Sequence, residues 1–286
     1  MWAWFLVISI TAILVSTSIR LIRGRMRVER VRHEMLTREL EQARQIQLAW
    51  LPGDSLQHSS VDIAAVNEPA NHISGDFYNW FELPDGRTVV IIGDVTGHGM
   101  SAAFLMATTQ LLVRTTMLRV GDPGRCMREI NRQLCQQVFN GQFVTMLILV
   151  INSADQCMDV AVSGHPAPLL VENGTPTSIP ITPQMVLGVD RDAEYPTERF
   201  GLSPNAQLIL YTDGVPDALG PDGSRLHTKG FLQLCAARQS SASELLDSIM
   251  AGLTRFRAKR ELCDDLTVVT IQFQPSPAET SELLPV

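Results

Sequence analysis

Apolar and β-branched residues gather in seven short runs along the chain, separated by polar turns and longer mixed segments. Runs of this length and composition predict β-strands. They cover residues 61–66, 76–82, 88–94, 145–152, 157–163, 208–212 and 266–273. Four longer segments predict helices, over residues 101–118, 124–139, 228–238 and 242–259.

The order of these segments decides the fold class. Strand follows strand at several points, so a strict strand–helix–strand alternation fails. An α+β layered fold with mainly antiparallel sheets is predicted instead. The runs on either side of residues 152–155 predict a hairpin. Residues 172–205 are richer in proline and polar residues, and we interpret them as a loop region beside the site or as a plain connection.

The first 22 residues differ from the rest of the chain. Residues 2–19 carry no charge, although five hydroxyl residues make them only moderately hydrophobic. If Arg20 extends towards the membrane surface, residues 1–22 reach about the 20 residues that cross a bilayer. Arginines follow at once, which predicts a single-pass membrane anchor with the C-terminal body in the cytoplasm. A cleaved signal peptide is the alternative, disfavoured by the lack of a basic start and of a small-residue cleavage site.

Residues 23–52 predict an amphipathic helical stem between this anchor and the main domain. Apolar residues recur there at spacings of three and four, and Pro52 and Gly53 end the pattern. The stripe is too short to establish a coiled coil. It is either the stem of a homodimer or a helix packed on the domain.

Bulk composition narrows the remaining possibilities. The chain has 286 residues, of which 45% are apolar, enough for one large domain at residues 53–273. A disordered tail is expected at residues 274–286. The net charge of -7 gives no support to nucleic-acid binding. The five cysteines form no closely spaced pair, so neither a zinc site nor a disulfide framework is indicated.

Aspartates stand at the ends of several predicted strands or beside glycine. The residues concerned are Asp76, Asp94, Asp213, Asp264 and Asp265. Carboxylates at strand ends can converge on one point, where they would repel one another unless a cation compensates them. Mg²⁺ and Mn²⁺ prefer oxygen ligands and use few of them from protein. The pattern therefore predicts a site for Mn²⁺ or Mg²⁺, and two such ions could activate water for hydrolysis of a phosphate ester.

The same strings carry a resemblance to a known family. In chain order they read GDFY, GDVTGHGMSAA, SGHPAPLL, YTDGVPDA and DDLTVV. This series resembles the SpoIIE-type branch of the PPM (type 2C-like) metal-dependent protein phosphatases, over residues 40–273. The resemblance implies an αββα sandwich, two central mainly antiparallel sheets flanked by helices. It also implies hydrolysis of phosphoserine or phosphothreonine on a cytoplasmic regulatory protein, in this branch often an anti-sigma-factor antagonist.

Roles for individual residues follow from that resemblance. It implies that Asp94 bridges the two metals and that the main-chain carbonyl of Val95 completes the second. Asp213 and Asp264 would hold the first metal. Asp76 would lie in the same cluster, either as a ligand or orienting a metal-bound water.

Other motif residues receive weaker assignments. His98 does not have the spacing from the motif aspartate that eukaryotic relatives show, so we interpret it as a loop residue. His165 is interpreted as a hydrogen-bonding or loop-shaping residue, and Thr145 as structural. Asn79 stands where many relatives have a second Asp, which argues against a third, weak metal site.

Two alternatives to a protein phosphatase remain open. One is a non-catalytic scaffold that binds a phosphoprotein, although the intact set of aspartates argues against it. The other is a metal-dependent phosphatase of a small metabolite, which a substrate panel would distinguish.

Overall fold

The computed structural model describes residues 2–53, 55–58, 61–71, 73–97, 99–136, 141–236, 239–258 and 260–274. The chain divides into two compact units, Met1–Ile46 and Gln47–Val286. Helix α1, Trp2–Trp50, accounts for the described part of the first unit. The second unit contains all the strands and the other helices.

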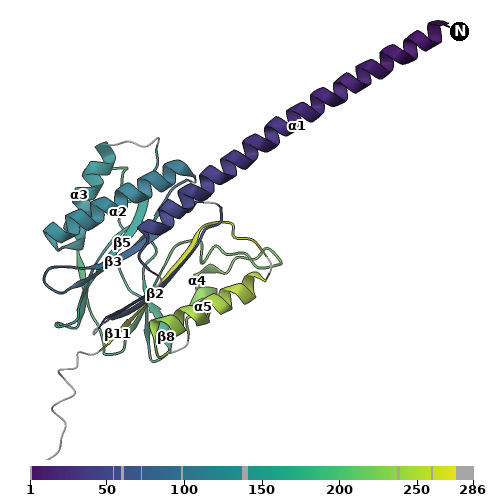
Figure 1. The fold of residues 1–286 in the computed structure, drawn as a ribbon. Coiled ribbons are helices and arrows are strands. Elements are labelled where there is room, and N and C mark those ends of the chain that lie inside the picture. The colour runs from purple at the N-terminus through teal and green to yellow at the C-terminus, as the bar shows by residue number, and fades with distance from the viewer. Residues whose placement is uncertain are drawn as a thin grey trace, which may run out of the picture. The chain divides into compact units, whose positions relative to one another are not determined.

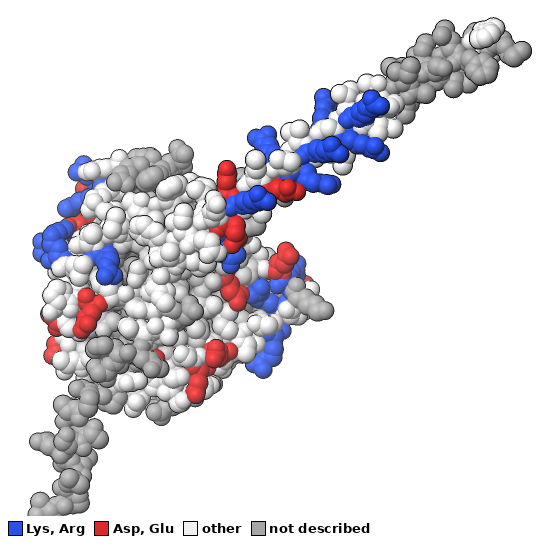
Figure 2. Space-filling model, viewed as in Figure 1, with Lys and Arg blue, Asp and Glu red and all other residues white. Residues whose placement is uncertain are grey.

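The predicted membrane anchor is wrong. Among the described residues, no helix combines the length and the apolar character that crossing a bilayer requires. Hydroxyl residues dilute the apolar character of residues 9–18, and arginines follow from Arg20 onward. Figure 2 shows these basic side chains spaced along the helix. The expected single-pass placement at a membrane, with the main domain in the cytoplasm, is withdrawn with the anchor.

Two antiparallel sheets form the centre of the second unit. Sheet A has the order β1-β2-β11-β10-β7-β8, and sheet B has the order β3-β4-β5-β6-β9. The strands of sheet A are β1 Ser55–His58, β2 Val61–Glu68, β11 Leu266–Phe273, β10 Gln207–Tyr211, β7 Leu169–Glu172 and β8 Thr175–Ser178. Those of sheet B are β3 Phe77–Glu82, β4 Thr88–Val95, β5 Val144–Asn152, β6 Cys157–Ser163 and β9 Glu198–Gly201.

Apolar residues cover both faces of the central strands, which explains why these strands appear as continuous apolar runs. In β4, Val90 and Ile92 pack in the cluster between the sheets, which also takes Val269 from β11. Val89 and Ile91 face the other way, into the cluster under the helices of sheet B. The sheets are therefore held on both sides and cannot shift without opening a core.

Helices close the two outer faces, so the order of layers is helix, sheet, sheet, helix (Figure 1). Helices α2, Met100–Val120, and α3, Pro123–Gln136, pack on sheet B through one cluster. Helices α4, His227–Leu234, and α5, Ala242–Arg257, pack on sheet A through another. The α+β prediction with two antiparallel sheets flanked by helices is confirmed.

Every strand and helix predicted in the second unit is present, with small differences at the ends. Helix α4 ends at Leu234, earlier than predicted. Four further strands were not predicted: β1, β7, β8 and β9. Two of them, β8 and β9, lie within residues 172–205, which we had interpreted as loop or connection. The predicted tail, beyond residue 274, lies outside the described residues.

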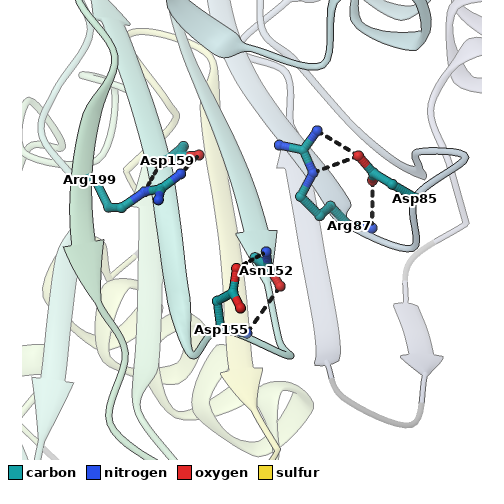
Figure 3. Close-up of polar contacts among 6 residues, drawn as sticks. All are labelled: Asp85, Arg87, Asn152, Asp155, Asp159 and Arg199. Carbon is teal, nitrogen blue, oxygen red and sulfur yellow. Dashed lines mark hydrogen bonds and ion pairs between the residues drawn. The ribbon is translucent and has the colours of Figure 1, made fainter.

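Charged pairs gather at one end of sheet B. Arg87 pairs with Asp85 in the turn before β4, at 2.7 Å, and Arg199 pairs with Asp159 across β9 and β6, also at 2.7 Å (Figure 3). The opposite end of β3 and β4 carries aspartates. That end of the two strands is the candidate site.

Candidate metal centre

Two of the predicted site residues lie side by side at one end of sheet B. β3 begins opposite the end of β4, where Phe77 pairs with Gly93. The preceding residue, Asp76, therefore lies beside Asp94, the next residue of β4. Besides burial, the charge of Asp94 raises the pKa of Asp76.

The other two predicted side chains come from sheet A. β10 ends opposite the start of β11, with Tyr211 paired to Val268. Asp213 leaves the end of β10, and Asp264 arrives just before β11. A Cβ placed on Gly214 would approach the main-chain oxygen of Asp265 to 1.9 Å, so the two loops touch there. The junction of the sheets thus places Asp213 and Asp264 where their charges act on Asp94.

Asp76 is the most buried of the four, with 2% of its surface exposed. Its Oδ2 accepts hydrogen bonds of 2.7 Å from the hydroxyls of Thr212 and Thr267. Burial, with the nearby charge of Asp94, raises the pKa of Asp76 well above its ordinary value. The two hydroxyls oppose this shift because they stabilise the carboxylate.

Like charges act on the remaining carboxylates too. Burial, followed by the charges of Asp213 and Asp264, raises the pKa of Asp94 to about 7. Burial is also the main cause of raised pKa values at Asp213 and Asp264. In the described ranges, none of these carboxylates is paired with an arginine or lysine. A bound cation would supply the missing compensation.

Main-chain oxygens add to the acidic set above Gly75. A Cβ built on Gly75 would lie 2.7 Å from the carbonyl oxygen of Val95, 3.1 Å from Oδ1 of Asp94 and 3.6 Å from the carbonyl oxygen of Gly97. Three oxygens therefore surround the space that glycine leaves open. An all-oxygen set of this kind suits Mg²⁺ or Mn²⁺ rather than zinc.

Side chains alone do not complete such a centre. Within the described ranges, no three His, Cys, Asp or Glu side chains are grouped so that they could hold a metal ion. The three oxygens nearest the open space at Gly75 include two carbonyls, of Val95 and Gly97. The oxygen donors nevertheless fit a hard divalent cation. Asp94 belongs both to the set of oxygens near Gly75 and to the set of acidic side chains.

The loop after β4 is held in place from β5. Oγ1 of Thr96 donates to the carbonyl of Phe143 at 3.1 Å and accepts from its amide at 2.9 Å. The side-chain amide of Gln142 donates to the carbonyl of Thr96 at 2.9 Å. These bonds fix the chain on the C-terminal side of Val95, whose carbonyl is a predicted ligand.

Adjacent aspartates before β11 have different surroundings. Asp265 accepts hydrogen bonds from the amides of Ala70 and Gly75, at 2.8 and 2.7 Å. Both its oxygens are therefore used to hold the loop that leads to Asp76. Asp264 accepts from the amide of Asp265 through one oxygen, Oδ1.

The histidines and Asn79 fall into place differently. His98 lies outside the described residues. His165 is buried, which lowers its pKa to about 3, so the ring is neutral. Its Nδ1 lies 3.0 Å from Oγ1 of Thr145, the residue paired with Asp94 across β4 and β5. Asn79 donates to the side chain of Gln110 on α2 at 3.0 Å.

Several residues that shape the site were not singled out from the sequence. The hydroxyls of Thr212 and Thr267 stand inside the strings YTDG and DDLT, where only the aspartates drew attention. Asn67 in β2 and Gln47 also contact the loop before Asp76 through Ser74. The position of the two threonines beside the acidic motifs is a signal that sequence reasoning could have used, whereas Asn67 and Gln47 lie in no motif.

Comparison with known proteins agrees with the fold and the motifs. The family model described as Stage II sporulation protein E (SpoIIE) matches residues 84–274. The chain is 29% identical over 184 residues to the phosphoserine phosphatase RsbP of Bacillus subtilis, covering 63% of this chain and 45% of RsbP. It is 24% identical over 239 residues to the phosphoserine phosphatase RsbU of the same organism, covering 82% of this chain and 70% of RsbU. Against Protein IcfG of Synechocystis, the chain spans 41% of that protein's length.

Solved structures share the fold at lower identity. The SiaA-PP2C domain of Pseudomonas aeruginosa superposes with a TM-score of 0.75 at 19% identity, covering 85% of this chain and 98% of that domain. A structure of RsbX in complex with magnesium gives a TM-score of 0.58 at 18% identity, covering 77% of this chain and 98% of RsbX.

The stability of the metal-free protein should depend on pH through Asp94. Its pKa is raised to about 7 in the fold, above the ordinary value, so the folded state keeps a proton that the unfolded state loses. Stability should therefore fall as the pH rises from about 4 to about 7, and then level off. Thermal melts in a chelator from pH 5 to pH 8 measure this. Asp94→Asn should flatten the slope, and equal slopes in both proteins would contradict the assignment.

Filling the space above Gly75 should weaken metal binding. A methyl group there would displace the oxygens of Val95 and Asp94, so Gly75→Ala should lower Mn²⁺ affinity about tenfold or more, as for other residues that orient ligands. Calorimetric titration with MnCl₂ measures the change. Gly201→Ala is the matched control because no atom lies within 4 Å of its added Cβ. Equal affinities for the two variants would argue against an ion at this position.

Proposed function

Because the chain belongs to the SpoIIE family of PPM-type phosphatases, we propose that it hydrolyses phosphoserine or phosphothreonine on a regulatory protein with the help of two divalent cations. The observation that carries this proposal is the position of Asp94, which lies beside Asp76 in sheet B and is affected by the charges of Asp213 and Asp264, without a basic partner in the described ranges. PPM phosphatases depend on metals, and a structural neighbour is described in complex with magnesium.

The chain's own residues divide the work between them. Asp94 and the carbonyl of Val95 would hold one side of the pair of cations, and Asp213 and Asp264 the other. When bound, the cations supply Lewis acidity that lowers the pKa of water and neutralises phosphoryl charge. The segment after β4, which contains Gly97 and Gly99, lets backbone approach the phosphate closely. It leads directly into the N-terminus of α2, whose free amides favour an anion.

The nature of the substrate rests on the relatives. Two of them, RsbP and RsbU, are named phosphoserine phosphatases. We extend that substrate class to this chain and propose a phosphorylated regulatory protein, such as an anti-sigma-factor antagonist. A panel containing a phosphoserine protein, phosphopeptides, sugar phosphates and nucleotides tests this. Preference for the sugar phosphates would instead support the small-metabolite alternative.

We also propose a homodimer formed through α1. Val28, Val31 and Met35 lie on one face of this helix and are 69%, 51% and 62% exposed. Arg27, Arg32 and Glu39 line the same shallow depression. Apolar side chains at this spacing can pack against the same face of a second copy.

Removing the metal or its principal ligands should abolish hydrolysis. The full chain should turn over a phosphoserine substrate with Mn²⁺ and stop when EDTA is added. Asp94→Asn and Asp213→Asn should each lower kcat/KM by about 100-fold or more, because each removes a carboxylate that would hold the cations, whose positive charge stabilises the transition state. Asp85→Asn is the control, since Asp85 pairs with Arg87 at the far end of β3 and β4. Wild-type rates in Asp94→Asn would rule out this chemistry, and binding of phosphoprotein without any turnover would support a scaffold.

Charge on the apolar face of α1 should separate the dimer. In light scattering after gel filtration, the combined Val31→Glu and Met35→Glu variant should run as a monomer at concentrations where the wild type is a dimer. Arg30→Glu also introduces a negative charge, but outside this apolar face, and should leave the dimer intact. A monomeric wild type would disprove the dimer without affecting the proposed catalytic role.

A further inference from the structure

We propose that Thr212 and Thr267 are positioning residues that clamp Asp76 between the two sheets and so set the spacing of the two halves of the metal centre. This inference rests on the proposed metal-dependent phosphatase function. It gives a role to the two threonines of the strings YTDG and DDLT, which are not among the predicted metal ligands.

Both hydroxyl protons are directed at Asp76 by the other bonds that the hydroxyls make. Oγ1 of Thr212 accepts a hydrogen bond from the amide of Thr267 at 3.0 Å. Oγ1 of Thr267 accepts one from the side-chain amide of Asn67 at 2.9 Å. A hydroxyl has one proton to donate, and in each case it goes to Oδ2 of Asp76, at 2.7 Å. The hydroxyls therefore cannot rotate away without breaking a second bond.

The same pattern fixes the orientation of the carboxyl group. Two donors end on Oδ2, so this oxygen must act as an acceptor. Neither hydroxyl bonds Oδ1, so both bonds hold the carboxyl group by the same oxygen. Threonine suits this role because its branched Cβ restricts χ1, and both threonines are fully buried. Buried hydrogen bonds of this kind are costly to break, since no water replaces them.

The clamp crosses from one sheet to the other. Thr267 belongs to β11, and Thr212 follows β10, both of sheet A. Asp76 precedes β3 of sheet B. The threonines stand beside the ligands of their own sheet, because Asp213 is the next residue after Thr212. Asp76 stands beside Asp94, the ligand from sheet B. The three side chains therefore link the two groups of predicted ligands directly.

A second set of bonds holds the same loop from sheet A. Asn67 also donates to Oγ of Ser74 and to the carbonyl of Asp76, both at 3.4 Å. Oγ of Ser74 accepts from the amide of Asp76 at 3.0 Å. The loop is thus fixed on the side of the threonines, and removal of a hydroxyl should release the side chain of Asp76 more than the backbone.

Removing either hydroxyl should weaken the metal centre while keeping the shape of the side chain. Thr267→Val and Thr212→Val should each lower the affinity for Mn²⁺ by about 10- to 100-fold, the usual effect of losing a group that orients a ligand. The measurement is calorimetric titration of the full chain with MnCl₂, together with KM and kcat for p-nitrophenyl phosphate at saturating Mn²⁺. Thr267→Ser keeps the hydroxyl and should restore most of the affinity.

Thr270→Val is the matched control on the same strand. Thr270 is fully buried, and its hydroxyl lies 2.8 Å from the carbonyl of Ala242, to which it donates, and 3.2 Å from that of Ala64, away from the site. This variant should lose thermal stability but keep wild-type Mn²⁺ affinity. If it lowers the affinity as much as Thr267→Val does, general destabilisation explains the effect and the clamp is refuted.

The remaining outcomes separate this inference from the proposed function. A wild type that binds Mn²⁺, with Thr212→Val and Thr267→Val binding it equally well, overturns the clamp alone. A folded wild type that binds no Mn²⁺ overturns the proposed function and the clamp with it. Should the valine variants fail to fold, Asn67→Ala removes the donor that orients Thr267. It should lower Mn²⁺ affinity by a smaller factor, and unchanged affinity would refute the clamp.

Discussion

Repulsion among buried carboxylates is the constraint on which the rest of this structure depends. Asp76 and Asp94 lie side by side, and Asp213 and Asp264 add negative charge from the facing sheet. Desolvation is strongest at the buried Asp76, while Asp213 and Asp264 are exposed residues; the pKa shifts of all four nevertheless share one direction, to which like charges contribute. In the described ranges, the compensation comes from neutral donors, hydroxyls and main-chain amides, rather than from basic side chains. Neutral donors stabilise a carboxylate without neutralising it, so the site keeps a negative charge that bound cations would compensate.

The sandwich can bear this repulsion because its sheets are packed on both faces. Separating the sheets at the acidic end would open the cluster that contains Ile92 and Val269. Moving one sheet sideways would disturb the clusters under the helices. Opening the core around a few side chains costs several kcal/mol of folding free energy, which is comparable to the net stability of a whole domain. The aspartates are therefore held near one another by packing far from the site itself.

The central strands were predictable from sequence because double-faced burial makes them uniformly apolar. The missed strands are short: β8 runs from Thr175 to Ser178 and β9 from Glu198 to Gly201, at the edges of their sheets and largely exposed. β9 pairs with β6, which lies far earlier in the chain, so no local pattern reveals it, whereas β8 forms a short hairpin with the adjacent β7. The prediction of a membrane anchor at the N-terminus is wrong for a different reason. The segment carries no charge, but its hydroxyl residues make it less apolar than a bilayer requires. At the site, residue type and motif order predict the aspartates as ligands, and this stays a prediction. The roles of Thr212 and Thr267 depend on which groups donate hydrogen bonds to which acceptors, and only the three-dimensional structure shows this.

The two neighbouring aspartates before β11 show how far residue type alone can mislead. Both are equally acidic in sequence, yet Asp265 uses both oxygens to accept amides from the loop at Ala70 and Gly75. Its carboxylate thereby joins the two sheets, as Asp76 does from the other side. Asp264 has one oxygen on the amide of its neighbour and the other left over. Since a ligand needs an oxygen that is not already committed, the hydrogen bonds favour Asp264 for the metal and Asp265 for the frame. The same criterion, applied to Asp76, leaves Oδ1 without a bond from either hydroxyl, so the clamp and the choice of ligand follow from one count of donors and acceptors.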